Sequence, residues 1–245
     1  MPSVTREHVP PAIEIVRLDR PAQRNALDSA TLAELLAILD ELAAAPDPPV
    51  LVVSTTSERA LCAGADVSEE LDAAAGVARM EAFARLYAAI EAYPGASVCV
   101  CVGNVVGAGA EVAAGCDLRV GGDNLKLAWA GARLGVPVGP ARLAPLIGES
   151  RARDLVLTGR GVGPDEALAL GFLNRVTGAA GAEAAALELA AQIAANDAEG
   201  VRRLKAMFRD LAGRPTSERV ARENEILVEW QRHGAGLPSG GVRRG

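Results

Sequence analysis

The residues that could do chemistry in this sequence lie around two short segments of small side chains. The first segment is Leu61–Asp66 and the second is Gly107–Gly109, and each comes after an apolar stretch. Small side chains let a ligand approach the main chain, and a helix that begins near Gly107 points its free N–H groups toward that ligand. One donor from each segment would form an oxyanion hole. From spacing alone, two ordinary tight turns explain the glycines equally well.

Other kinds of catalytic site have few residues to build on. The two histidines, His8 and His233, lie near the two ends, which disfavours a Ser–His triad and a histidine-ligated zinc site. No glycine run leads into a P-loop lysine, and a dinucleotide fingerprint that starts at Gly107 fails at Val112. The four cysteines form no CxxC pair, so we expect small buried residues and no metal site. Chemistry must therefore depend on carboxylates, backbone dipoles or a cofactor.

Charge and composition exclude several classes of protein. The formal net charge is −6 and the charges are interspersed, whereas a protein that binds nucleic acid presents a basic face. No apolar run reaches the ~20 residues that a membrane span requires. Residues 1–11 lack the basic and hydrophobic stretches of a secretory signal. We therefore expect a cytoplasmic protein that binds neither nucleic acid nor a membrane.

The elements that must position the two segments alternate between strands and helices. Apolar stretches predict strands at 12–18, 50–54 and 97–102, and shorter ones at 118–120, 125–128 and 172–175. Helical spacing predicts helices over 32–42, with Asp28 or Ser29 as N-cap, over 83–90, up to Gly115, and over most of the chain after 140. This order indicates a mostly parallel sheet covered by helices, with a helical C-terminal segment. Loops at the carboxyl ends of its strands would form the binding crevice.

Several stretches, in matching order and spacing over nearly the whole chain, resemble the enoyl-CoA hydratase/isomerase (crotonase) family. They are Arg20–Leu27, Cys62–Asp66, Gly103–Glu111 with Cys116 and Asp117, Leu134–Val136, and Ala167–Val176. The resemblance implies an α/β fold with a crotonase-like core of repeated ββα units over residues 1–180. It also implies a C-terminal helical region over 181–245 that is used in trimer formation, and a homotrimer or a dimer of trimers.

The resemblance also implies the ligand and the residues that hold it. The substrate would be a CoA thioester, with no cofactor bound permanently and no metal, and its carbonyl would accept hydrogen bonds from the N–H groups of Ala65 and Ala108. The positions that match the CoA-lining residues of the family are Arg24, Ala26, Ala63, Asp66 and Val67. Such donors would stabilise an enolate next to the thioester, each by about 3 kcal/mol of barrier.

Glu111 matches the family glutamate that handles a proton or activates water. It lies in a segment of alanines and valine, where a carboxylate is costly to bury unless it has a partner or a function. Its simplest structural role is that of an acidic residue at a helix start. The second glutamate of the hydratases would stand at Gly131, so that position carries no carboxylate.

The missing carboxylate leaves two hypotheses open. Hydration usually needs one group to activate water and one to supply a proton, so Glu111 does both jobs, another residue helps, or standard hydration is lost. Candidate helpers are Trp129, Arg133, Glu69 and Glu70, whose simplest roles are packing or solvated charge. The first hypothesis is an enoyl-CoA hydratase-type lyase or isomerase centred on Glu111. The second is an acyl-CoA-binding homologue that kept the pocket and lost hydratase activity.

Overall fold

The computed structural model describes residues 2–233, and the chain divides into two compact units, 1–201 and 202–245. We expected a boundary after residue 180. The division falls later because helix α8 (Ala182–Ala194) packs on the strands of the first unit. All the residues predicted to act on the ligand therefore belong to the first unit.

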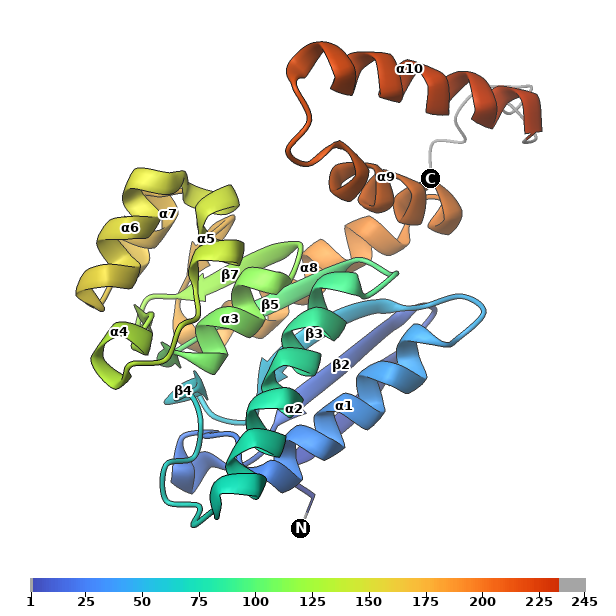
Figure 1. The fold of residues 1–245 in the computed structure, drawn as a ribbon. Coiled ribbons are helices and arrows are strands. Elements are labelled where there is room, and N and C mark those ends of the chain that lie inside the picture. Colours follow the sequence, from blue (N-terminus) through green and yellow to red (C-terminus); the bar gives the residue numbers. More distant parts are fainter. Residues whose placement is uncertain (1, 234–245) are drawn as a thin grey trace. The chain divides into compact units, whose positions relative to one another are not determined.

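The main sheet of the first unit has six strands and is parallel except at one edge. Its strands are β1 (Val4–Val9), β2 (Ile13–Leu18), β3 (Val50–Thr55), β5 (Ser97–Cys101), β7 (Leu118–Gly122) and β9 (Arg175–Thr177), in the order β1-β2-β3-β5-β7-β9 (Figure 1). Only the β1–β2 pair is antiparallel. The strands β3 and β5 are apolar and almost wholly buried, as strands covered on both faces must be.

A second, smaller parallel sheet leads into the two segments of small residues, Leu61–Asp66 and Gly107–Gly109. It consists of β4 (Ala60–Cys62), β6 (Asn104–Val106) and β8 (Lys126–Ala128). Three successive units each give one strand to the main sheet, one to the small sheet and then a helix. The helices are α2 (Ala73–Ala92), α3 (Ala108–Gly115) and α4 (Gly131–Leu134). The predicted α/β fold with repeated ββα units is confirmed.

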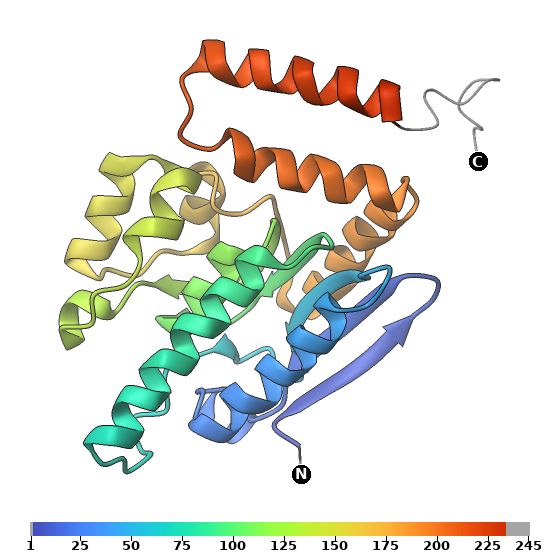
Figure 2. The same ribbon diagram turned by 45° about the vertical axis from the view of Figure 1, so that its right-hand side comes forward.

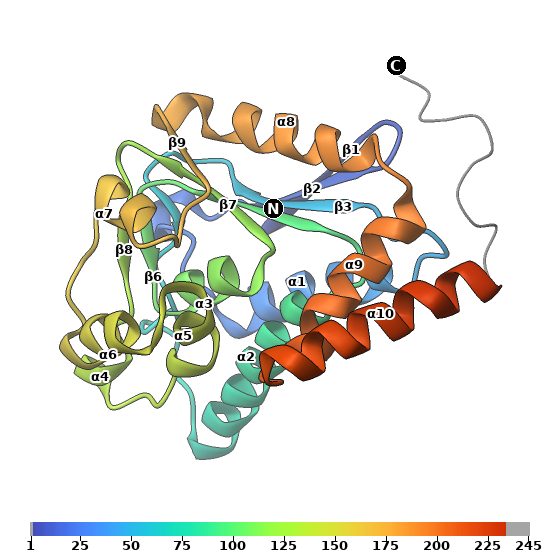
Figure 3. The same ribbon diagram turned by 90° about the horizontal axis from the view of Figure 1, so that it is seen from above.

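Helices cover both faces of the main sheet. Figure 3 shows α8 on one side and α1 (Ser29–Ala43), α2 and α3 on the other, and α1 and α2 lie side by side in Figure 2. Helix α1 begins at the N-cap Asp28, whose carboxylate accepts from Thr31 N. Five leucines of α1 are buried in the core between the sheet and the helices, each stabilising the fold by roughly 1.5–3 kcal/mol.

The remaining helices complete the two units. In the first unit they are η1 (Pro21–Gln23), α5 (Pro140–Ile147), α6 (Glu149–Thr158), α7 (Pro164–Ala169) and η2 (Ala179–Gly181). Helix α9 (Ala198–Leu211) begins in the first unit, and α10 (Thr216–His233) belongs to the second. None of the helices within residues 2–233 combines the length and apolar character that crossing a membrane demands.

Candidate active site

The loops that follow β4 and β6 lie against each other without intervening side chains. A Cβ atom on Gly64 would stand 3.3 Å from the Val106 carbonyl oxygen and 4.0 Å from the nitrogen of Ala108. A Cβ atom on Gly109 would stand only 2.4 Å from the carbonyl oxygen of Cys62. The glycines thus allow the two main chains to approach more closely than any larger residue would permit.

The N–H groups of Ala65 and Ala108 have no hydrogen-bond partner within the described part of the chain. Around Ala65, Leu27 N donates to the Gly64 oxygen (2.8 Å) and Asp66 N donates to the Leu27 oxygen (2.9 Å). Ala108 is the first residue of α3, where helix geometry leaves the N–H unpaired. Both donors are therefore available, from two loops in contact. Their convergence on one ligand atom stays a prediction.

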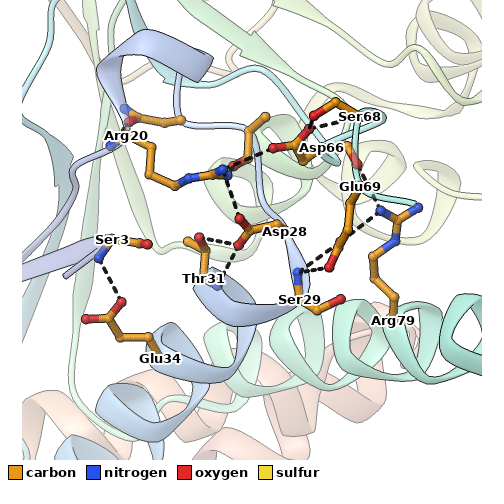
Figure 4. A network of polar contacts seen from close by, with 12 residues as sticks. Ser3, Arg20, Asp28, Ser29, Thr31, Glu34, Asp66, Ser68, Glu69 and Arg79 are labelled. Atoms are coloured by element: carbon orange, nitrogen blue, oxygen red, sulfur yellow. Dashed lines mark hydrogen bonds and ion pairs between the residues drawn. The ribbon is translucent and has the colours of Figure 1, made fainter. Parts of the chain in front are cut away.

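Side-chain contacts of Asp66 and Glu69 anchor the loop after β4 (Figure 4). Asp66 pairs with Arg20 (3.1 Å), and Arg20 also pairs with Asp28 (2.8 Å). Asp66 further accepts from the Ser68 hydroxyl (2.6 Å), which is the main cause that lowers the pKa of Asp66 below its usual value. The backbone of Asp66 is engaged as well, because its N–H donates to the Leu27 oxygen and its carbonyl accepts from Arg79 Nη1 (2.9 Å each).

Glu69, a candidate helper, has a structural position instead. Its carboxylate accepts from Ser29 N at the start of α1 (3.1 and 3.2 Å) and pairs with Arg79 of α2 (3.2 Å). It therefore ties the loop to both helices. The neighbouring Glu70 is exposed.

Four of the residues predicted to line CoA lie on two adjacent segments. Ala63 N donates to the Arg24 oxygen (3.0 Å), which places Arg24 and Ala26 beside the loop that carries Ala63 and Val67. Arg24 has positive φ (51°) and is exposed, and Val67 is 83% exposed. These side chains border solvent, as contacts to the polar end of a long ligand would require.

Glu111 is fully buried, and both of its carboxylate oxygens are held. Trp129 Nε1 donates to Oε1 (2.8 Å), and Arg142 Nη1 donates to Oε2 (2.9 Å). Glu111 stands three residues after Ala108 on α3, so both lie on one face of the helix. Trp129 also packs edge-on against Phe172, with ring centroids 5.5 Å apart. Trp129 therefore packs in the core, as predicted, and also donates a hydrogen bond to Glu111.

Opposing influences act on the charge of Glu111. Burial raises the pKa of its carboxyl above the usual value, and the hydrogen bond from Arg142 is the largest influence in the opposite direction. Trp129 also lowers the Glu111 pKa, whereas Glu91 raises it. A carboxyl whose pKa is raised is a stronger base when ionised, which suits it to accept and return a proton.

Arg142 is the residue at this site that sequence reasoning missed. It lies on α5, Nε stands 3.4 Å from Glu91 Oε2, and the guanidinium carbon lies 5.0 Å from the centroid of the Tyr87 ring. The available signal was a single cation among apolar residues, Pro140–Ile147. Its partner, 31 positions earlier, could not be read from that pattern.

The position of the missing second glutamate lacks a carboxylate and also lacks the space for a side chain. Gly131 is buried at the start of α4, and a Cβ atom there would stand 2.6 Å from the Val136 carbonyl oxygen. Arg133, a candidate helper on the same helix, is exposed. Among residues 2–233, the hydrogen-bond partners of the Glu111 carboxylate are Trp129 and Arg142, and neither is a second carboxylate.

Comparison with known proteins places these features in context. The model of the family described as enoyl-CoA hydratase/isomerase matches residues 9–236. A Bacillus subtilis protein provisionally named as an enoyl-CoA hydratase/isomerase is 30% identical over 242 residues, covering 95% of this chain and 92% of that protein. The enoyl-CoA isomerase/hydratase claC of Penicillium crustosum is 34% identical over 181 residues, which are 70% of this chain but only 20% of that protein.

Solved structures agree with the fold. A Mycobacterium abscessus protein, provisionally named as an enoyl-CoA hydratase/isomerase, superposes with a TM-score of 0.87 at 27% identity and covers 96% of this chain and 92% of its own. The whole ββα core therefore has a counterpart of known structure.

Proposed function

Since the chain belongs to the enoyl-CoA hydratase/isomerase family, we propose that it converts an enoyl-CoA thioester at Glu111. In this proposal the thioester carbonyl accepts hydrogen bonds from the N–H groups of Ala65 and Ala108. The observation that carries the proposal is the combination of two unpaired N–H groups on touching loops with a buried carboxylate one helical turn from one of them.

The proposed chemistry follows from the carbonyl and the carboxylate. Hydrogen bonds to the carbonyl oxygen stabilise the negative charge that develops when a proton is lost or a nucleophile adds to the conjugated double bond. In a double-bond shift, the carboxylate of Glu111 takes a proton from one carbon and returns it to another. In hydration, it takes a proton from water as oxygen bonds to the β-carbon, and the same proton is then delivered to the α-carbon. Either sequence needs only one carboxylate.

The CoA part of the substrate would lie along Arg24, Ala26, Ala63, Asp66 and Val67. This placement rests on the pairing of the two segments that carry them. No permanently bound cofactor is needed for the proposed steps. A homotrimer or dimer of trimers and a cytoplasmic location stay predictions.

A second function has its own supporting observation. Gly131 leaves Glu111 without a carboxylate partner, and Arg142 and Trp129 already hold both Glu111 oxygens. A site of this kind could bind acyl-CoA thioesters without turning them over. The retained carboxylate beside the two N–H groups favours the enzyme.

Turnover of short and medium trans-2-enoyl-CoA thioesters by the purified protein separates the two functions. Loss of the conjugated thioester absorbance reports turnover, and product analysis then separates hydration from a shifted double bond. Binding of the saturated acyl-CoA is measured alongside by calorimetry. Turnover supports the enzyme, whereas tight binding without any turnover would replace it with the binding protein.

A further inference from the structure

Arg142 lies where three groups of the first unit meet. Its Nη1 contacts the buried carboxylate of Glu111 (2.9 Å), its Nε lies 3.4 Å from Glu91 Oε2 without a hydrogen bond, and its guanidinium stacks over the Tyr87 ring (5.0 Å). The side chain is 18% exposed. An arginine so enclosed has its geometry fixed by packing as well as by charge.

Charge balance at Glu111 depends on this arginine. A fully buried carboxylate without a counter-charge becomes protonated, and a protonated carboxyl cannot accept a proton from substrate. Trp129 donates a hydrogen bond but carries no charge. Arg142 is therefore the cation that can keep Glu111 ionised, although it is shared with Glu91.

We propose that Arg142 is a positioning residue, which holds Glu111 in its charged form and in one orientation, and that Glu91 limits this effect by competing for the same guanidinium. The inference rests on the proposed function, because it concerns the carboxylate that would handle the proton. Arg142 on α5 and Glu91 on α2 would thus affect catalysis through Glu111, and neither side chain would touch the substrate.

The charged and titratable groups around Glu111 come from several elements. From α5 comes Arg142, from α2 come Glu91 and Tyr87, and Cys62 of β4 is close enough to influence Tyr87 electrostatically. Burial raises the pKa of Tyr87 and, to about 12, that of Cys62. Both stay neutral near physiological pH, so Arg142 and Glu91 are the groups whose charge sets that of Glu111.

The two partners predict opposite changes, which a purely structural role would not produce. Arg142→Gln removes the cation but keeps a hydrogen-bonding side chain, so the pKa of Glu111 should rise. Glu91→Gln removes the competing carboxylate, so the Glu111 pKa should fall. Arg142→Lys keeps the charge and should restore most of the wild-type value. Arg153→Gln, which removes an exposed ion pair with Glu149 on α6, is the matched control.

The indole N–H of Trp129 gives a readout that does not depend on turnover. Its nitrogen lies 2.8 Å from Glu111 Oε1, and the only other tryptophan is Trp230. The indole ¹H–¹⁵N resonance of Trp129, assigned with Trp230→Phe, is followed against pH in each variant. Glu111→Gln should abolish its titration and so identifies the transition.

The midpoint pH of the change in the Trp129 indole resonance should be higher in Arg142→Gln than in the wild type and lower in Glu91→Gln. It should be unchanged in Arg153→Gln. The acid limb of kcat/KM should move in the same directions if the protein turns over an enoyl-CoA. A transition that stays in place in Arg142→Gln and in Glu91→Gln would overturn the inference. If the transition moves but no variant shows turnover, the inference stands and the proposed function fails.

Discussion

Glu111 combines full burial with hydrogen bonds to both oxygens, and its direct role in proton transfer can be isolated by a single substitution. Glu111→Gln keeps the shape of the side chain and removes the base. General acid–base catalysis by one group contributes typically 10²–10⁴-fold, so kcat should fall by about that factor. Affinity for the saturated acyl-CoA, measured by calorimetry, should change little. Unchanged kcat would remove Glu111 from the mechanism.

At the residue scale, sequence reasoning identified the candidate donors and the carboxylate but not the surroundings of that carboxylate. Glu111, Ala65 and Ala108 were predicted from family motifs. In the described residues the N–H groups of Ala65 and Ala108 are unpaired, whereas Trp129 and Arg142 hold both oxygens of Glu111. Arg142 was missed because an ion pair between residues 31 positions apart depends on how α5 packs on α3. Sequence reasoning also missed that the backbone around Gly131 leaves no room for a side chain. Gly131→Glu would force the new side chain against the backbone at Val136, so it does not simply restore a second carboxylate.

At the scale of elements, the separation of the two site loops is set by Gly109. The first turn of α3 passes so close to β4 that a methyl group on Gly109 would overlap the backbone of Cys62. The contact is with main-chain atoms, which cannot move away as a flexible side chain could. The distance between the N–H groups of Ala65 and Ala108 therefore depends on a glycine that carries no chemistry.

Gly109→Ala should separate the loops and weaken the site. Overpacking of this kind typically costs about 1–3 kcal/mol of unfolding free energy, which denaturant titration measures. Gly76→Ala on α2 is the control, since nothing lies within 4 Å of its Cβ position, and it should stabilise the helix by up to ~1 kcal/mol. Acyl-CoA affinity should fall only in Gly109→Ala. Equal stability and affinity in the two variants would contradict the close contact.

The long elements were predicted well and the short strands only in part, since those expected at 118–120 and 125–128 correspond to β7 and β8. The buried strands at 50–54 and 97–102 correspond to β3 and β5, and the leucine helix corresponds to α1. The strand β1, with an exposed middle, and the three-residue strands β4 and β6 gave no periodic signal. The strand expected at 172–175 begins at Arg175 as β9, because the N–H groups of Phe172 and Leu173 donate to the Ala167 oxygen of α7.

At the scale of the whole molecule, the helices α9 and α10 carry apolar side chains that a single chain leaves exposed. Among them are Leu204, Phe208, Val220 and Leu227. Exposed apolar surface of this kind is typical of a protein–protein interface. It is consistent with the predicted use of the C-terminal helices in assembly.

Light scattering at micromolar concentration tests that assembly. A homotrimer or a dimer of trimers should give a mass of three or six times the 25.1 kDa of one chain. Phe208→Asp, on the exposed side of α9, should lower the mass because a charge is costly to bury in an apolar interface. A wild-type mass close to that of one chain would contradict the prediction.

The central claim, that Ala65 and Ala108 donate to the thioester carbonyl, is tested most directly by the infrared spectrum of a bound acyl-CoA labelled with ¹³C at that carbonyl. Two hydrogen bonds weaken the C=O bond, so we expect the labelled band to move to lower wavenumber on binding and to remain shifted in Glu111→Gln. In Gly109→Ala the shift should shrink as the donors separate. A labelled band that stays at its solution position, with the wild-type protein saturated, would contradict the oxyanion hole.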